Sequence, residues 1–100
     1  MVLSRVVFQA KFGAADALVA AIKAGYAEAT DDQLKALQPR ILTDISGSFD
    51  TVVVETTHES LAALEQFRQM VFARNADSEQ QSRMAELVES GRNEYWTIED

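Results

Sequence analysis

Residues 41–67 read ILTDISGSFDTVVVETTHESLAALEQF, and this stretch decides the fold class. Residues 40–46 and 49–55 have the alternation and β-branched composition of two strands, and the serine-glycine-serine between them is typical of a turn. Thr56 and Glu59 match the S/T-x-x-E capping box, which predicts a helix that begins near residue 57 or 58. We therefore expect a hairpin followed directly by a helix.

The rest of the chain extends this pattern on both sides. Residues 3–12 alternate as a half-buried strand, and the alanine-rich residues 14–29 have helical spacing. A short helix is predicted from Thr30, and an extra helix over 78–89, which Gly91 would end, precedes a closing strand over 93–99. The order β-α-β-β-α-β predicts an α+β fold, a ferredoxin-like sandwich with an antiparallel sheet and helices on one face.

Alternation along the strands assigns residues to the two faces of this sheet. The residues expected to face the helices are Val6, Phe8, Ala10, Phe12, Ile41, Ile45, Val52, Val54, Trp96 and Ile98. The opposite face then carries Arg5, Val7, Gln9, Lys11, Leu42, Asp44, Val53, Glu55, Tyr95 and Thr97. This second face mixes apolar and ionisable groups, which suits a sheet packed on a second copy of the chain. We expect a homodimer through this face.

Residues 41–67, together with the ending ELVESGRNEYWTIE at 86–99, also carry a family likeness. In these stretches and in element order, the chain resembles the dimeric α/β-barrel superfamily, with the closest pattern in NIPSNAP-like and related uncharacterised members. The resemblance implies two ferredoxin-like protomers packed sheet to sheet. Members of the superfamily include cofactor-independent monooxygenases, haem-degrading enzymes, isomerases, polyketide cyclases and proteins of no known activity, so the fold does not choose a function.

Composition narrows the classes of partner. The 100 residues carry 16 acidic and nine basic side chains, a net charge of −7, and the basic residues are scattered singly, which disfavours a nucleic-acid partner. The longest purely apolar run, residues 17–22, is too short to span a bilayer, and the N-terminus has no secretory signal pattern. Absence of cysteine fits a reducing compartment. We expect one soluble, cytoplasmic domain over residues 1–100, with no membrane partner.

His58 is the single histidine, and histidine is the side chain that titrates near neutral pH. The predicted capping box places it in the first helical turn, close to a strand end, where it is the candidate catalytic residue, a general base. The alternative is a solvated residue at the start of a helix. No metal site is expected, because His58 and Glu59 point in different directions on a helix and no HxxxH or HExxH motif exists.

Polar residues on the strands form a second candidate site. On a sheet face that excludes water they could orient a small ligand. The expected ligand-binding residues are Gln9, Lys11, Glu55 and Tyr95. The alternative is cross-strand ion pairing at a dimer surface, of Lys11 or Arg5 with Glu55 or Asp44. Most of the aromatic residues are expected in the core.

Two functions stay open. One is a metal-independent enzyme without a cofactor, of the monooxygenase, isomerase or cyclase type. It would act on a small apolar or aromatic metabolite, in a cavity between sheet and helices or at the dimer interface. The other is a non-enzymatic homodimeric module that binds a small ligand or a partner. Haem handling, a third reading, depends on His58 alone.

Overall fold

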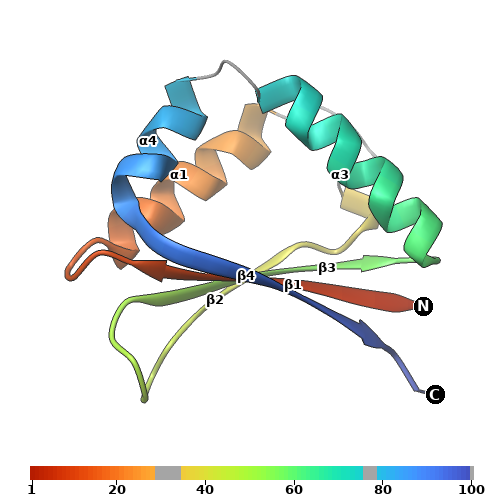
Figure 1. Cartoon of the computed structure of the whole chain (residues 1–100), viewed down its shortest axis with the longest axis horizontal. Coiled ribbons are helices and arrows are strands. Elements are labelled where there is room, and N and C mark those ends of the chain that lie inside the picture. The colour runs from red at the N-terminus through yellow and green to blue at the C-terminus, as the bar shows by residue number, and fades with distance from the viewer. Residues whose placement is uncertain (29–34, 76–78, 100) are drawn as a thin grey trace.

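The computed structural model describes residues 1–28, 35–75 and 79–99, which form an antiparallel sheet with helices over one face (Figure 1). The elements are β1 (Val2–Ala10), α1 (Ala15–Glu28), β2 (Arg40–Thr43), β3 (Thr51–His58), α3 (Leu61–Asn75), α4 (Glu79–Leu87) and β4 (Val88–Thr97). The strand order is β2-β3-β1-β4, and every neighbouring pair is antiparallel. The predicted ferredoxin-like α+β fold is confirmed. The start of the short helix predicted from Thr30 lies outside the described residues.

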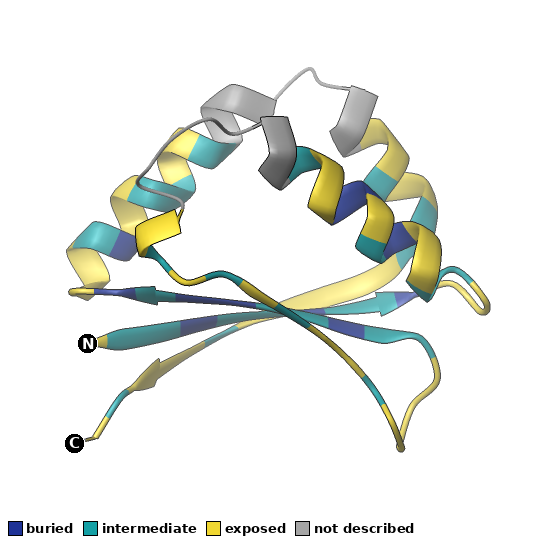
Figure 2. Ribbon diagram, turned by 180° about the vertical axis from the view of Figure 1, so that it is seen from behind, coloured by how far each residue is buried: buried dark blue, intermediate teal, exposed yellow. Residues whose placement is uncertain are grey.

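The sheet has one covered face and one open face (Figures 1 and 2). Helices α1, α3 and α4 all lie on the covered face, and the molecule measures 35 × 32 × 19 Å. Val52 and Val54 of β3 lie opposite Phe8 and Val6 of β1, on the covered side. The predicted inward positions in β1, β2 and β3 are confirmed: Val6, Phe8, Ala10, Ile41, Val52 and Val54.

The apolar core lies where α1 and α4 cover the sheet. Leu18 of α1 and Val52 of β3 are completely buried, and Met84 and Leu87 of α4 pack against the same cluster. Burial of one such side chain contributes about 1.5 to 3 kcal/mol. Gly91 lies in β4 over Phe8, where a Cβ would come within 3.4 Å of the phenyl ring. Its predicted role as a helix terminator is wrong, because α4 ends at Leu87 and the chain passes directly into β4.

The third strand is longer than its sequence pattern indicates. β3 continues through Thr56 to His58, so Thr56 is not a helix cap and the predicted capping box is wrong. The helix begins instead at Leu61, and the hydroxyl of Ser60 accepts a hydrogen bond of 3.1 Å from the backbone N–H of Ala63. Pairing with β1 explains why β3 continues to His58. Val2 lies opposite His58, so β1 provides a partner for each residue up to the end of the strand.

Two residues predicted to face the helices lie in turns at one end of the sheet. Phe12 is 87% exposed in the turn after β1, and Ile45 is fully exposed in the loop after β2. Phe12 contacts Phe49, itself exposed, with a ring separation of 6.2 Å. The Asp50 carboxylate orders this end by accepting hydrogen bonds from the backbone N–H groups of residues 13 and 15. These strands are therefore shorter than predicted, and the aromatic pair lies outside the core.

Candidate functional site

The open face of the sheet carries a row of alternating charges that crosses all four strands. Register places Arg40 of β2 opposite Glu55 of β3, Glu55 opposite Arg5 of β1, and Arg5 opposite Glu94 of β4. Side-chain ion pairs connect each step, at 2.5, 2.9 and 3.0 Å in that order. Arg92 extends the row along β4 with a contact of 2.8 Å to Glu94. We call these five residues the charge ladder.

The ladder confirms the ion-pairing alternative for Arg5 and Glu55. Glu55 is buried at 6% exposure although it lies on the uncovered face, because the guanidinium groups of Arg5 and Arg40 cover its carboxylate from both sides. Both of its oxygens accept charge-assisted hydrogen bonds, which are about twice as strong as neutral ones. A carboxylate held in this way is a fixed structural group rather than a free acid or base.

Glu94 at the other end of the ladder has three donors. The Arg92 guanidinium donates to one of its oxygens, and Arg5 and the indole N–H of Trp96 donate to the other. These hydrogen bonds, that from Arg92 first and that from Trp96 next, lower the pKa of the Glu94 carboxyl. Both carboxylates of the ladder are thus held among arginines and have their charge paired within the sheet.

Apolar rows border the ladder on both sides. Across the sheet, one row runs through Val7, Val53 and Leu42, and the other joins Leu3 with Trp96. Leu42 and Trp96 are 37% and 54% exposed, so each row presents one apolar side chain to solvent, whereas Val7 is buried. Predicted positions on this face are confirmed for Arg5, Val7, Gln9, Leu42, Val53 and Glu55.

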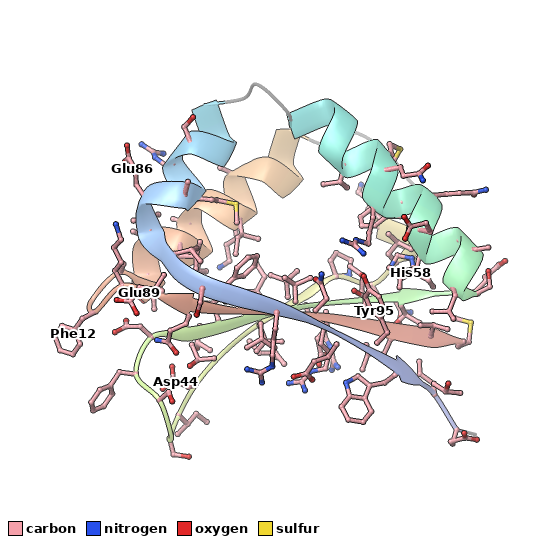
Figure 3. All side chains as sticks on the ribbon, viewed as in Figure 1. Phe12, Asp44, His58, Glu86, Glu89 and Tyr95 are labelled. Atoms are coloured by element: carbon pink, nitrogen blue, oxygen red, sulfur yellow. The ribbon has the colours of Figure 1, made fainter. Side chains whose placement is uncertain are left out.

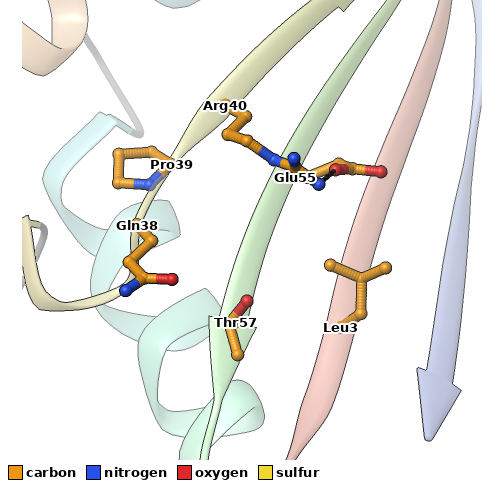
Figure 4. Close-up of a pocket in the computed structure, with 6 residues that line it drawn as sticks. All are labelled: Leu3, Gln38, Pro39, Arg40, Glu55 and Thr57. Carbon is orange, nitrogen blue, oxygen red and sulfur yellow. Dashed lines mark hydrogen bonds and ion pairs between the residues drawn. The ribbon is translucent and has the colours of Figure 1, made fainter. Parts of the chain in front are cut away.

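A groove lies at the β2 end of this face (Figure 4). Its volume is about 400 Å³, which falls in the range of small-molecule sites. The lining combines apolar, amide, hydroxyl and charged groups: Leu3, Gln38, Pro39, Arg40, Glu55 and Thr57. Gln38 and Pro39 line the groove just before β2 begins. Gln38 has a left-handed backbone conformation, with a φ of 52°. The groove therefore unites one end of the charge ladder with an apolar wall.

His58 lies on the other side of the sheet, beneath α3. It is the last residue of β3 and 2% exposed, so the expectation of a solvated residue in a first helical turn is wrong. Its ring stands 5.3 Å from that of Phe67 on α3. The Thr56 hydroxyl and His58 Nε2 share a hydrogen bond of 2.8 Å, in which the hydroxyl donates when Nε2 is the unprotonated nitrogen.

Burial sets the protonation state of His58. Removal from water disfavours the imidazolium form and lowers the pKa of His58 below its ordinary value of 6.5. The ring is therefore neutral at pH 7, the form in which a histidine accepts a proton. The same contacts make it a poor haem ligand, because Nε2 already faces the Thr56 hydroxyl inside the protein.

Tyr95 and Trp96 exchange the faces predicted for them. Register sets Trp96 opposite Leu3 on the open face and Tyr95 opposite Ser4 on the covered face. Arg68 of α3 donates a hydrogen bond of 2.6 Å to the Tyr95 hydroxyl, a contact that only the covered face allows. The same register puts Thr97 on the covered side, against prediction, while Ile98 lies beyond the end of β4.

The predicted ligand-binding residues do not converge on one site. Gln9 and Glu55 lie on the open face, and the Gln9 amide donates to the carbonyl of Phe49 in the loop before β3. Lys11 is exposed just beyond β1. Tyr95 shares the covered face with His58 near α3 (Figure 3), but β1 separates their strands, a spacing of about 10 Å. The structure therefore does not bring His58 together with Gln9, Lys11 or Glu55.

The solved structures that resemble this chain share its architecture over nearly their whole length. A NIPSNAP family protein of unknown function from Agrobacterium tumefaciens, solved twice, superposes with TM-scores of 0.81 and 0.75 at 16% and 15% identity. Those matches cover 97% and 96% of this chain and 92% and 86% of the neighbour. An uncharacterised NIPSNAP domain protein from Burkholderia xenovorans has a TM-score of 0.67 at 15% identity and covers 99% and 95%. The fold is NIPSNAP-like.

This likeness confirms the resemblance expected from residues 41–67 and 86–99 as a shared fold. At 15 to 16% identity it transfers no site residue, and those neighbours are themselves described as uncharacterised or of unknown function. No protein-family model matches the chain, and no curated protein matches it in sequence.

The sequence did not predict some of the residues that line the groove or that lie near His58 under α3. Arg40, Leu3 and Thr57 line the groove, and Arg68 contacts Tyr95. Strand alternation would have placed Leu3 beside Arg5 on the open face, but the partner of Arg68 depends on the register of β4. In the described part of the chain, no three metal-ligating side chains come together. Among the described helices, none is long and apolar enough to cross a membrane.

Proposed function

We propose that this chain is a homodimeric small-ligand-binding protein whose two copies pack through their open sheet faces, in the manner of a dimeric α/β barrel. The observation that carries the proposal is the open face itself. Its charges are paired within one sheet while Leu42 and Trp96 stay exposed. A face of this kind loses little polar solvation on being covered and gains burial of Val53, Leu42 and Trp96.

Charge supports a second copy as the partner. The three arginines and two glutamates of the ladder give the open face one net positive charge. The remainder of the chain then carries eight negative charges, since the total is −7. Two acidic copies repel each other least through this face, so electrostatics favours it for self-association.

The groove supports a ligand within such a dimer. It opens on the same face, beside the charge ladder, and a second sheet packed there would close it from solvent. Leu3 and Pro39 supply apolar wall, which suits a small apolar or aromatic body. Localisation in the cytoplasm and the absence of a cofactor stay predictions within this proposal.

Native mass spectrometry of the untagged protein tests the dimer. We expect a dimer for the wild type and a folded monomer for Val53→Asp, because two copies would then bring like charges into an apolar row. Ala62→Asp adds the same charge at an exposed position of α3 and should leave the dimer intact. A wild-type monomer, or a dimer that survives Val53→Asp and not Ala62→Asp, would show that the open face is not the interface.

A second candidate is a metal-independent enzyme of the monooxygenase, isomerase or cyclase type, with His58 as general base. The buried, neutral imidazole beneath α3 favours it, since a catalytic base needs a proton-accepting form at working pH. A panel of phenols and hydroquinones screened for oxygen uptake tests the monooxygenase form. Turnover by the wild type and its loss in folded His58→Gln would support this candidate, whereas equal turnover in the variant would remove His58 from the mechanism.

A further inference from the structure

We infer that the groove binds a small carboxylate with a flat apolar or aromatic body, and that the Arg40 guanidinium holds the carboxylate. This inference rests on the proposed ligand-binding function and specifies the ligand's chemical class.

The Arg40 guanidinium at the groove has donors that its own ion pair does not use. Glu55 lies between two guanidinium groups, those of Arg5 and Arg40. Arg5 is committed on both sides, since Nε donates to Glu55 and Nη1 to Glu94. Arg40 donates to Glu55 through Nη2, and its side chain is 68% exposed. Its other donors are thus available at the groove for a second carboxylate, in the bidentate geometry that arginine favours.

The rest of the lining suits an apolar body. Leu3 and Pro39 form apolar wall on either side of β3, and Figure 4 shows them on opposite sides of Glu55 and Thr57. Trp96 lies directly opposite Leu3 in the β1–β4 register and extends this wall toward the β4 edge of the sheet. A volume of about 400 Å³ accommodates one aromatic ring and a short polar substituent.

The backbone at the groove is held in a strained conformation. Gln38 has a φ of 52°, which costs a residue with a Cβ about 1 kcal/mol or more. Two backbone hydrogen bonds hold the segment: Gln38 donates to Lys35 at 3.2 Å, and Thr57 of β3 donates to Leu37 at 2.9 Å. Strain maintained in this way is typical of preformed ligand sites. It sets the position of Pro39 and Arg40 before a ligand arrives.

Benzoate and its neutral analogue benzamide test the inference by calorimetry and by the fluorescence of Trp96, the single tryptophan. We expect saturable benzoate binding and at least tenfold weaker benzamide binding, because a charge-assisted hydrogen bond is lost. Arg40→Gln should weaken benzoate at least tenfold, and Arg40→Lys less. Arg92→Gln is the matched control, since Arg92 is equally exposed on the same face but lies outside the groove, and it should bind like the wild type.

Equal binding of benzamide and benzoate, or unchanged benzoate binding in Arg40→Gln, would overturn the inference. Native mass spectrometry of the same samples separates it from the proposed function. A wild-type dimer that binds benzamide but shows no preference for benzoate keeps the proposed function and refutes the carboxylate. A monomer that binds benzoate through Arg40 keeps the groove and refutes the proposed dimer.

Discussion

The two faces of the sheet are built from the same strands, but their side chains lie in different surroundings. Val52 and Val53 are sequence neighbours in β3, and they point to opposite faces. Val52 is completely buried against Leu18 under the helices, whereas Val53 lies in an apolar row of the open face. One strand thus contributes both to the core under the helices and to the uncovered face of the sheet.

Buried polar groups also find their partners differently on the covered face and on the open face. On the covered face, buried Thr56 and His58 bond to each other, because α3 excludes the water that would otherwise solvate them. On the open face, Glu55 is buried by its own arginine neighbours and needs no covering helix.

An aspartate introduced on the covered side of β3 should lower the unfolding free energy far more than one introduced on the open side. Val52→Asp would bury a carboxylate with no partner and should cost about 3 to 5 kcal/mol of unfolding free energy, enough to unfold many domains of this size. Val53→Asp should lower it by less than about 1 kcal/mol when measured on the monomer. Urea unfolding followed by circular dichroism distinguishes them, and similar losses in both variants would contradict the division into a covered and an open face.

A matched pair of leucines sharpens the comparison without adding charge. Leu18→Ala removes a wholly buried side chain and should destabilise the protein by about 2 to 5 kcal/mol, the range for cavities in a core. Leu42→Ala removes a side chain that is 37% exposed on the open face and should cost the monomer less than about 1 kcal/mol. Thermal unfolding of both variants under conditions where each is monomeric measures the difference. If Leu42→Ala were the more damaging change, the open face would be part of the monomer core.

Removal of the shared carboxylate of the charge ladder should lower the unfolding free energy by a smaller amount. Glu55→Gln leaves Arg5 and Arg40 without their shared carboxylate, and we expect a loss of about 1 to 2 kcal/mol, because both arginines are partly solvated. Glu65→Gln, at an exposed position of α3, is the control and should be close to neutral. Urea unfolding at low and high salt measures both, and an unchanged midpoint for Glu55→Gln would show that the ladder contributes nothing to stability.

The smallest effect is expected from the pH dependence that His58 confers. Its pKa is lowered in the folded protein, so the unfolded chain binds the proton more readily and stability rises with pH in this range. The contribution of the neutral ring is complete above pH 6.5 and is lost as the pH falls from 6.5 through the folded-state pKa. His58→Gln keeps a polar partner for Thr56 and should flatten this slope. An unchanged slope between pH 7 and 5.5 would assign it to other groups.

Much of the fold could be predicted because its signals are local. Alternation in residues 3–12 and 51–54 placed Phe8 and Val52 on one face and Arg5 and Val53 on the other. The candidate site was predicted only in part. The pairing of Arg5 with Glu55 was among the alternatives, but the depth of His58 was missed, because Thr56 and Glu59 imitate a capping box where β3 in fact continues.

By itself, the sequence determined the order of elements, the inward face of three strands and the acidic balance, since each depends on spacing along the chain or on composition. Only the tertiary structure decided which face of the sheet Tyr95 and Trp96 occupy. Each has an apolar ring and one polar group, so either face suits it. The tertiary structure also decided the charge ladder and the groove, because these unite residues up to 89 positions apart through the pairing register of four strands.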